Sequence, residues 1–182
     1  MKSPFPGMDP FLERHWQDVH SRFMVYASTL LNQQLPQELL ARVEASLAVE
    51  SDDERTRIIY PDISVICGPI LYLVGRKDTV VNPVVLVEVL SPSTEAYDRG
   101  EKAAHYRSIA SLQSYVLVSI ARMAVERFDR ASDGSWSLRD CPEVLAIPAL
   151  GIELPVAEIY AEVDFSAVDA SPEALSTRSP LP

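Results

Sequence analysis

The sequence predicts a mixed α/β fold, an α+β arrangement in which helices flank a sheet of parallel and antiparallel strands. Residues 83–90 (PVVLVEVL) form a continuous β-branched run, which is typical of a strand buried on both faces. A helix expected at 98–109 and a strand expected at 113–120 follow it with the lengths of a βαβ unit, so the two strands should be parallel. A chain of 182 residues suits one domain with a substantial core.

The N-terminal part predicts an arm followed by a helix. Residues 1–16 hold prolines, a glycine and several large apolar side chains, which predicts an ordered arm. Residues 18–35 place apolar side chains near a 3.6-residue period, so we expect an amphipathic helix that the following proline ends. We therefore expect an arm and helix at 1–36 that pack on a core domain at 37–163. A tail at 164–182, rich in Ser, Pro and Ala, should be disordered.

The core domain predicts several strands separated by turns. Alternating apolar residues indicate strands at 42–50 and 58–67, with a bulge or a sheet edge at Pro61. The helix at 98–109 should begin with a capping box, in which Asp98 is the N-cap and Glu101 is the third helical residue. The other expected elements are a loop or short hairpin arm at 68–78, antiparallel strands at 122–130 and 135–140, an apolar return at 144–154 and one or two helical turns at 155–161.

Composition and charge exclude several classes of protein. No apolar run reaches the roughly 18 residues that a membrane span needs, and the N-terminus has no signal-peptide core, so we expect a cytoplasmic protein. The two cysteines are too few for a disulfide scaffold. A net charge of −10 argues against a generic nucleic-acid binder. Residues 131–182 carry two basic and nine acidic side chains, so much of the acidity lies away from the candidate site.

Two acidic residues interrupt strands that are otherwise apolar. Asp62 lies in IIYPDISVIC, and Glu88 lies in VVLVEVLS. A carboxylate among β-branched side chains is costly unless its charge is offset, and a divalent cation would offset it. Because Mg²⁺ (or Mn²⁺) is typically held by one or two carboxylates, both are candidate ligands, with the backbone carbonyl of Val89 as a third. Asp62 could instead bond local N–H groups in a turn, and Glu88 could belong to a buried salt bridge.

Lys102 and Tyr106 lie four residues apart on the predicted helix after the Glu88 strand. A βαβ crossover places the start of that helix near the carboxyl ends of the strands, where sites of α/β proteins usually lie. A lysine there could orient or deprotonate a metal-activated water and stabilise charge on phosphorus. Taken alone, Lys102 would be a solvated lysine and Tyr106 a packing residue. Only their combination with Asp62 and Glu88 indicates a phosphodiesterase-type site.

Other candidate sites have weaker patterns. His15 and His20 are five residues apart, which is the wrong spacing for one helix face, so we do not pair them as ligands. Ser91 and Ser93 lack the GxSxG context of a serine hydrolase. Two carboxylates can also hydrolyse glycosides, but the sequence shows no pattern of a sugar-binding aromatic platform.

The stretch that includes PDISVIC, NPVVLVEVLSPST and YDRGEKAAHYRSIASLQSYVLVSI resembles the Uma-type family of the PD-(D/E)XK nuclease superfamily. The resemblance covers about residues 58–130. Its most specific parts are PD, VEVLSPST and the D-x3-K-x3-Y spacing of Asp98, Lys102 and Tyr106. It implies a restriction-endonuclease-like core with a βαβ unit and flanking helices. It also implies an Mg²⁺-dependent endonuclease that hydrolyses phosphodiester bonds of DNA.

The same resemblance implies roles for individual residues. Asp62 and Glu88 would be the metal ligands, and Lys102 would be the catalytic lysine. The superfamily's plain pattern is Glu-x-Lys on one strand, but this chain has Leu90 at the lysine position. The assignment therefore requires Lys102 to reach the site from the helix.

The N-terminal SPFPGMDPFLE, followed by Trp16, Asp18 and His20, resembles a second bacterial domain, one of unknown function. The nuclease superfamily often has an acidic residue on its first helix or strand. Glu44 is the first candidate for that catalytic position and Glu50 is the second.

A different class of function also fits the sequence. The chain could be a catalytically silent nuclease-fold module that serves in protein assembly or regulation. Its acidic C-terminal third and apolar N-terminal arm would then be partner surfaces. Exchange of the arm between two copies would give a homodimer.

Overall fold

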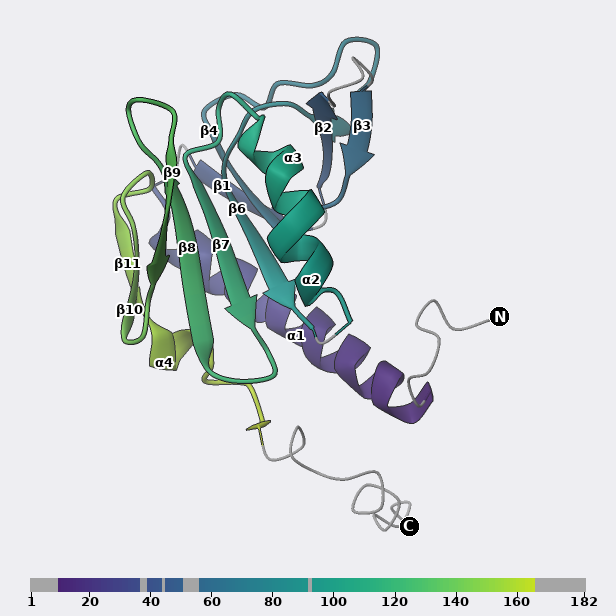
Figure 1. Cartoon of the computed structure of the whole chain (residues 1–182), viewed down its shortest axis with the longest axis vertical. Helices are drawn as coiled ribbons and strands as arrows, with labels where there is room; N and C mark the ends of the chain where they lie inside the picture. Colours follow the sequence, from purple (N-terminus) through teal and green to yellow (C-terminus); the bar gives the residue numbers. More distant parts are fainter. Residues whose placement is uncertain (1–9, 37–38, 44, 51–55, 92, 166–182) are drawn as a thin grey trace.

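A computed structural model of the chain describes residues 10–36, 39–43, 45–50, 56–91 and 93–165. Its centre is a six-stranded mixed sheet, which confirms the predicted mixed α/β class (Figure 1). The strands of this sheet are β1 (Leu39–Val43), β4 (Ile63–Cys67), β6 (Pro83–Leu90), β7 (Ser114–Ser119), β8 (Ala124–Arg130) and β9 (Trp136–Asp140).

The strands of the central sheet follow the order β1-β4-β6-β7-β8-β9. Strands β6 and β7 pair in parallel, with Glu88 opposite Leu117, which confirms the predicted βαβ unit. Strands β7, β8 and β9 pair antiparallel, as the sequence predicted. Strand β6 is therefore an inner strand, with β4 on one side and β7 on the other.

Helix α1 (Pro10–Gln34) lies across one face of the central sheet (Figure 1). Its buried side chains are spaced three and four residues apart, so they share one side of the helix. They pack in one core with Val85, Val87 and Val89 of β6. The buried α1 residues of this core are Phe23, Met24, Ala27 and Leu31.

A helical segment at 95–107 lies on the opposite face of the sheet (Figure 1). It packs in a second core with Leu86 and Leu90, which alternate along β6 with the valines that face α1. Strand β6 is thus buried on both faces, as its apolar run predicted. By the same alternation, Glu88 lies on the side of the helical segment. The segment consists of α2 (Glu95–Tyr97), the π-helix η1 (Asp98–Lys102) and α3 (Ala103–Arg107).

Two of the predicted strands are each divided into two. The strand expected at 42–50 and the strand expected at 58–67 both pass from one sheet to another. Pro61 lies in the second break, where a residue without an N–H cannot donate to a continuous ladder. The second sheet, called the smaller sheet below, has three strands: β2 (Ser46–Glu50), β3 (Thr56–Ile59) and β5 (Thr79–Val80). Their order is β3-β2-β5.

The helices begin earlier than the sequence predicted. Helix α1 starts at Pro10, so the described part of the expected arm is helical, while residues 1–9 lie outside the described part. The second helical segment starts at Glu95 rather than at Asp98. The predicted capping box is wrong, because Asp98 lies inside the helical segment and its carboxylate pairs with Lys102.

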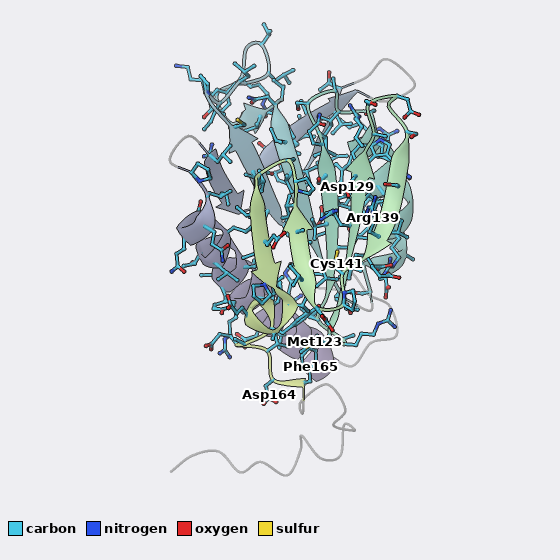
Figure 2. The ribbon with its side chains drawn as sticks, turned by 90° about the vertical axis from the view of Figure 1, so that its left-hand side faces the viewer. Met123, Asp129, Arg139, Cys141, Asp164 and Phe165 are labelled. Carbon is cyan, nitrogen blue, oxygen red and sulfur yellow. The ribbon has the colours of Figure 1, made fainter. Side chains whose placement is uncertain are left out.

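A hairpin, β10 (Val144–Ile147) and β11 (Ile152–Pro155), is followed by helix α4 (Val156–Ile159). Figure 2 shows this hairpin lying over the sheet, and its apolar side chains join the same core as α1. The hairpin therefore accounts for the apolar segment predicted at 144–154, and α4 accounts for the helical turn predicted at 155–161. From residue 166 on, the predicted tail lies outside the described residues. In the part of the chain that the structure describes, no helix has the length and apolar composition needed to cross a bilayer.

Candidate functional site

Glu88 lies in a buried polar cluster between β6 and the helical segment. The residue is 1% exposed. Its Oε1 accepts a hydrogen bond from the Tyr106 hydroxyl at 2.7 Å and lies 2.7 Å from Lys102 Nζ. Lys102 Nζ also lies 3.3 Å from Asp98 Oδ1. Lys102 therefore reaches the strand carboxylate from the helix, and its side chain is only 11% exposed rather than solvated.

The local sequence explains why three helix side chains converge on one strand residue. Asp98, Lys102 and Tyr106 follow each other at intervals of four residues and therefore share one side of the helix. The Tyr115 hydroxyl on β7 donates to the Asp98 carbonyl at 3.0 Å and fixes the start of this face. The Tyr115 ring also packs edge-on against the Tyr106 ring, with centroids 5.3 Å apart. A π-helical turn, a feature frequent at functional sites, spans Asp98 to Lys102.

Asp62 reaches the site from the neighbouring strand. It directly precedes β4, next to the end of β6. Its Oδ2 accepts the Val89 N–H at 2.7 Å and lies 3.1 Å from His20 Nε2 on α1. In a strand, the N–H and C=O of one residue point to the same side, so the Val89 carbonyl also points to the β4 side of β6. The structure thus brings Asp62 beside the strand residue that follows Glu88.

Electrostatics couples the two carboxylates. Burial and the charge of Asp62 raise the pKa of Glu88 to about 8, although Lys102 and Tyr106 act in the opposite direction. Burial would also raise the pKa of Asp62. His20, the Val89 N–H and, more weakly, Lys102 outweigh that effect and hold the pKa of Asp62 below its usual value. Asp62 is therefore ionised at neutral pH, and additional positive charge beside Glu88 would favour the ionised form of that carboxyl group.

The charge state of Lys102 limits the chemical roles that its amine can have. Burial would lower the pKa of this amine, but the charges of Glu88 and Asp98 raise it above its ordinary value. Lys102 is therefore an ammonium at neutral pH. An ammonium can stabilise negative charge or donate a hydrogen bond, but it cannot accept a proton. Of the two roles expected from the sequence, this favours charge stabilisation over deprotonation of a water.

The donor atoms of the site fit a hard divalent cation. All hydrogen bonds that the two carboxylates accept from the described residues arrive at Asp62 Oδ2 and Glu88 Oε1. The other oxygen of each carboxylate is thus left for a ligand. Among the described residues, no three His, Cys, Asp or Glu side chains are grouped to hold a metal. Two carboxylates and a backbone carbonyl nevertheless suit Mg²⁺, which commonly keeps waters and substrate oxygens as its other ligands.

Of the two predicted acidic candidates, one lies outside the described residues and the other lies on a strand of the smaller, three-stranded sheet. Glu44 lies outside the described residues. Glu50 ends β2 in the smaller sheet, where it pairs with Thr56 rather than with a strand of the central sheet.

Two residues near the site were not predicted to belong to it. The first is His20, which we set aside because of its spacing from His15. Its spacing of three, four and seven residues from the buried α1 residues Phe23, Met24 and Ala27 could have placed it on the inward face. The second is Asp98, whose interval of four residues from Lys102 was the available signal.

A second ion pair, between buried Arg127 and half-buried Asp129, lies in the central sheet on β8. Arg127 is 6% exposed, and its Nε donates to Asp129 Oδ2 at 2.8 Å. The Ser114 hydroxyl donates to Asp129 Oδ1 at 2.9 Å. Figure 2 shows Asp129 beside Arg139 of the neighbouring strand β9, away from α1. Both oxygens of this carboxylate accept hydrogen bonds from the protein, which distinguishes it from Asp62 and Glu88.

The comparison with solved structures shows the fold alone. A structure from Anabaena variabilis, titled a putative nuclease belonging to DUF820, has a TM-score of 0.55 and 15% sequence identity with this chain. The match covers 84% of this chain and 80% of that one. The neighbour supports the restriction-endonuclease-like architecture that the sequence motifs implied.

Sequence comparisons identify the family. Two uncharacterized Synechocystis proteins are similar: slr1290 is 38% identical over 109 residues, and sll1609 is 32% identical over 87 residues. These matches cover 58% and 48% of this chain and 55% and 49% of the relatives, so the chain spans about half the length of the curated relatives it matches. The family model Uma2, described as "Putative restriction endonuclease", matches residues 14–157. Because that match spans more than half of the chain and includes both carboxylates and the helical segment, the chain belongs to the Uma2 family.

Proposed function

We propose that this protein is an Mg²⁺- or Mn²⁺-dependent endonuclease that hydrolyses phosphodiester bonds of DNA. The observation that carries the proposal is the convergence of Asp62, Glu88 and Lys102, with Lys102 Nζ 2.7 Å from Glu88 Oε1. An ammonium beside two carboxylates at the ends of adjacent strands is suited to phosphoryl chemistry, in which a cation and a positive side chain share the charge of the phosphate. Membership of the Uma2 family supports DNA as the substrate.

Each residue has a role that its contacts support. Asp62, Glu88 and the Val89 carbonyl would hold the cation, which when bound supplies Lewis acidity and a water of lowered pKa. Water would lose a proton to solvent, its oxygen would bond to phosphorus, and the bond to the sugar oxygen would break, with that oxygen taking up a proton from solvent. Lys102 would stabilise the negative charge that grows on the phosphate oxygens during this exchange. The Tyr106 hydroxyl keeps Glu88 Oε1 in place, since it donates to that oxygen at 2.7 Å.

Plasmid cleavage tests the proposal directly. Purified wild-type protein should nick or linearise supercoiled DNA with Mg²⁺ or Mn²⁺, and EDTA should stop the reaction. Glu88→Gln and Lys102→Met should each lower the rate by about 100-fold or more, because each removes charge from the transition-state environment.

Two control variants separate chemistry from stability in this assay. Lys77→Met removes an exposed lysine of the 68–78 loop and should leave the rate unchanged. Asp129→Asn disturbs the Arg127–Asp129 ion pair without touching the site, so it shows how far lost stability alone lowers the rate. If the wild type and both site variants leave the DNA equally intact, the endonuclease proposal is wrong under these conditions.

The catalytically silent module remains the second candidate, and one observation favours it. Glu88 already has a buried ion pair with Lys102, which by itself offsets part of its charge without a metal. Calorimetry with Mn²⁺ distinguishes the two candidates. Binding at micromolar to millimolar strength that is lost in Asp62→Ala would count against the silent module.

A further inference from the structure

Helix α1 brings one polar side chain to the edge of the site. His20 shares its side of the helix with the buried Phe23, Met24 and Ala27. Its Nε2 lies 3.1 Å from Asp62 Oδ2, although 42 residues separate the two in the chain. The two side chains are 25% and 16% exposed. The packing of α1 on the sheet therefore sets this contact, and local sequence does not.

The contact fixes one oxygen of the Asp62 carboxylate. The Val89 N–H reaches the same Oδ2 at 2.7 Å, so donors from α1 and from β6 meet on one atom. Rotation of the carboxylate would break both hydrogen bonds. The described residues leave Oδ1 without a hydrogen bond, so it is the oxygen that can face a ligand.

We propose that His20 is a positioning residue for Asp62: its Nε2–H donates to Oδ2 and holds Oδ1 in the orientation that a divalent cation requires. Outer hydrogen-bond partners of this kind orient metal ligands, and their removal typically weakens metal binding by about 10- to 100-fold. The part that concerns the cation rests on the proposed function. The fixing of Asp62 concerns the metal-free protein and is independent of it.

A competing arrangement makes the opposite prediction. If the imidazole occupied the place of the cation, its removal would tighten metal binding. The contacts with Asp62 favour positioning, because the ring engages the oxygen that Val89 N–H already holds and leaves the other one open. The Val89 carbonyl also acts on the ring, which is what the competing arrangement requires. The sign of the change in affinity therefore decides between the two arrangements.

Variants that differ only in the length of the side chain at position 20 provide the sharpest comparison. A glutamine amide nitrogen extends about as far from the backbone as His Nε2, whereas an asparagine amide is one carbon shorter. Both are neutral amides of equal hydrogen-bonding type, so they differ in distance rather than in polarity. His20→Gln should retain the function of His20, and His20→Asn and His20→Ala should lose it. His105→Ala is the matched control, because His105 is also a partly buried helix histidine but contacts Glu101.

Hydrogen exchange of the Val89 amide tests the fixing of Asp62 without any metal. In EDTA, the Val89 N–H should exchange about 10-fold faster in His20→Ala and His20→Asn than in wild type, because its acceptor is no longer held. Exchange in His20→Gln and His105→Ala should match wild type. Equal protection of this amide in wild type, His20→Ala and His20→Asn would overturn the inference. Urea unfolding of each variant confirms that the comparison is made between folded proteins.

Calorimetry with Mn²⁺ tests the consequence for the cation. His20→Ala and His20→Asn should bind Mn²⁺ about 10- to 100-fold more weakly than wild type, and His20→Gln should recover most of the affinity. Wild-type affinity or tighter binding in His20→Ala overturns the proposed link to the cation. If the wild type binds no Mn²⁺ while the Val89 amide still depends on His20, the proposed metal site fails and the positioning of Asp62 by His20 stands.

Discussion

The two carboxylates of the site are held in contrasting ways. Glu88 is sealed under the helical segment, and its partners Lys102 and Tyr106 follow it within 18 residues of the chain. Asp62 is more open, with a side chain that is 16% exposed, and its partner His20 comes from a helix 42 residues away. The sealed half, which is Glu88 with Lys102 and Tyr106, lies within one βαβ unit. The open half, which is Asp62 with His20, is complete only when α1 packs on the sheet. Changes in the sealed half should therefore affect stability most, and changes in the open half should affect ligand binding more than folding.

The largest effect on stability should come from removing the positive charge of Lys102, which lies in the sealed half. Lys102→Met leaves Glu88 and Asp98 buried without their shared ammonium, which should lower the free energy of unfolding by about 3–5 kcal/mol. Urea denaturation measures this change. The double variant Glu88→Gln/Lys102→Met should be less destabilised than the sum of its single changes, because the two residues contact each other. An unchanged urea midpoint in Lys102→Met would show that the sealed half is not held by this pair.

A smaller loss should follow from removing one hydroxyl of the same half. Tyr106→Phe keeps the buried ring but deletes the hydrogen bond to Glu88 Oε1, so we expect a loss of about 1.5–3 kcal/mol in the free energy of unfolding. Tyr97→Phe is the control, since Tyr97 is 46% exposed and should change stability by less than about 0.5 kcal/mol. Equal urea midpoints for the two variants would contradict the importance of this contact.

The smallest effect should be a pH dependence of the free energy of unfolding in metal-free protein, caused by His20 and Asp62 of the open half. Asp62 and the Val89 carbonyl raise the pKa of His20 above its ordinary 6.5, although burial opposes them. The stability that His20 contributes is thus fully present below pH 6.5 and is lost as the pH rises through its folded pKa. The pKa of Asp62 lies below its ordinary 3.8, so the stability from Asp62 is present above pH 3.8 and is lost as the pH falls.

Unfolding free energies of wild type and His20→Gln at pH 5 and pH 8 measure this effect. Wild type should lose about 0.5–1 kcal/mol relative to His20→Gln between these two values, as expected for a partly exposed ion pair. A difference that stays constant with pH would mean that the His20 contact carries no charge.

The fold could be predicted where the pattern is local. The run PVVLVEVL identified β6, and the lengths of the following helix and strand identified the parallel pair. The divided strands were missed, because alternation of apolar residues continues across Ala45 and across Pro61 while the chain changes sheets. Which sheet a strand joins depends on long-range pairing, such as that of β2 with β5.

The site could be predicted from the sequence to a similar degree. Glu88 and Asp62 were identifiable because carboxylates are costly among β-branched residues. Lys102 was identifiable only with the family motif, since its burial depends on the packing of the helical segment on β6. His20 was missed because its partner lies in a distant part of the chain, and no local spacing links it to Asp62.

The shared helix face of Asp98, Lys102 and Tyr106 also limits how this segment can change in length. Successive residues of an α-helix are rotated by about 100° around its axis, so one deletion or insertion turns everything beyond it by that angle. A single-residue change between Asp98 and Tyr106 would turn part of the shared face away from Glu88. The exposed turn at 74–77 within the 68–78 loop has no such phase to keep. Length variation among related chains should therefore gather in that loop and be excluded from the helical turns beside β6.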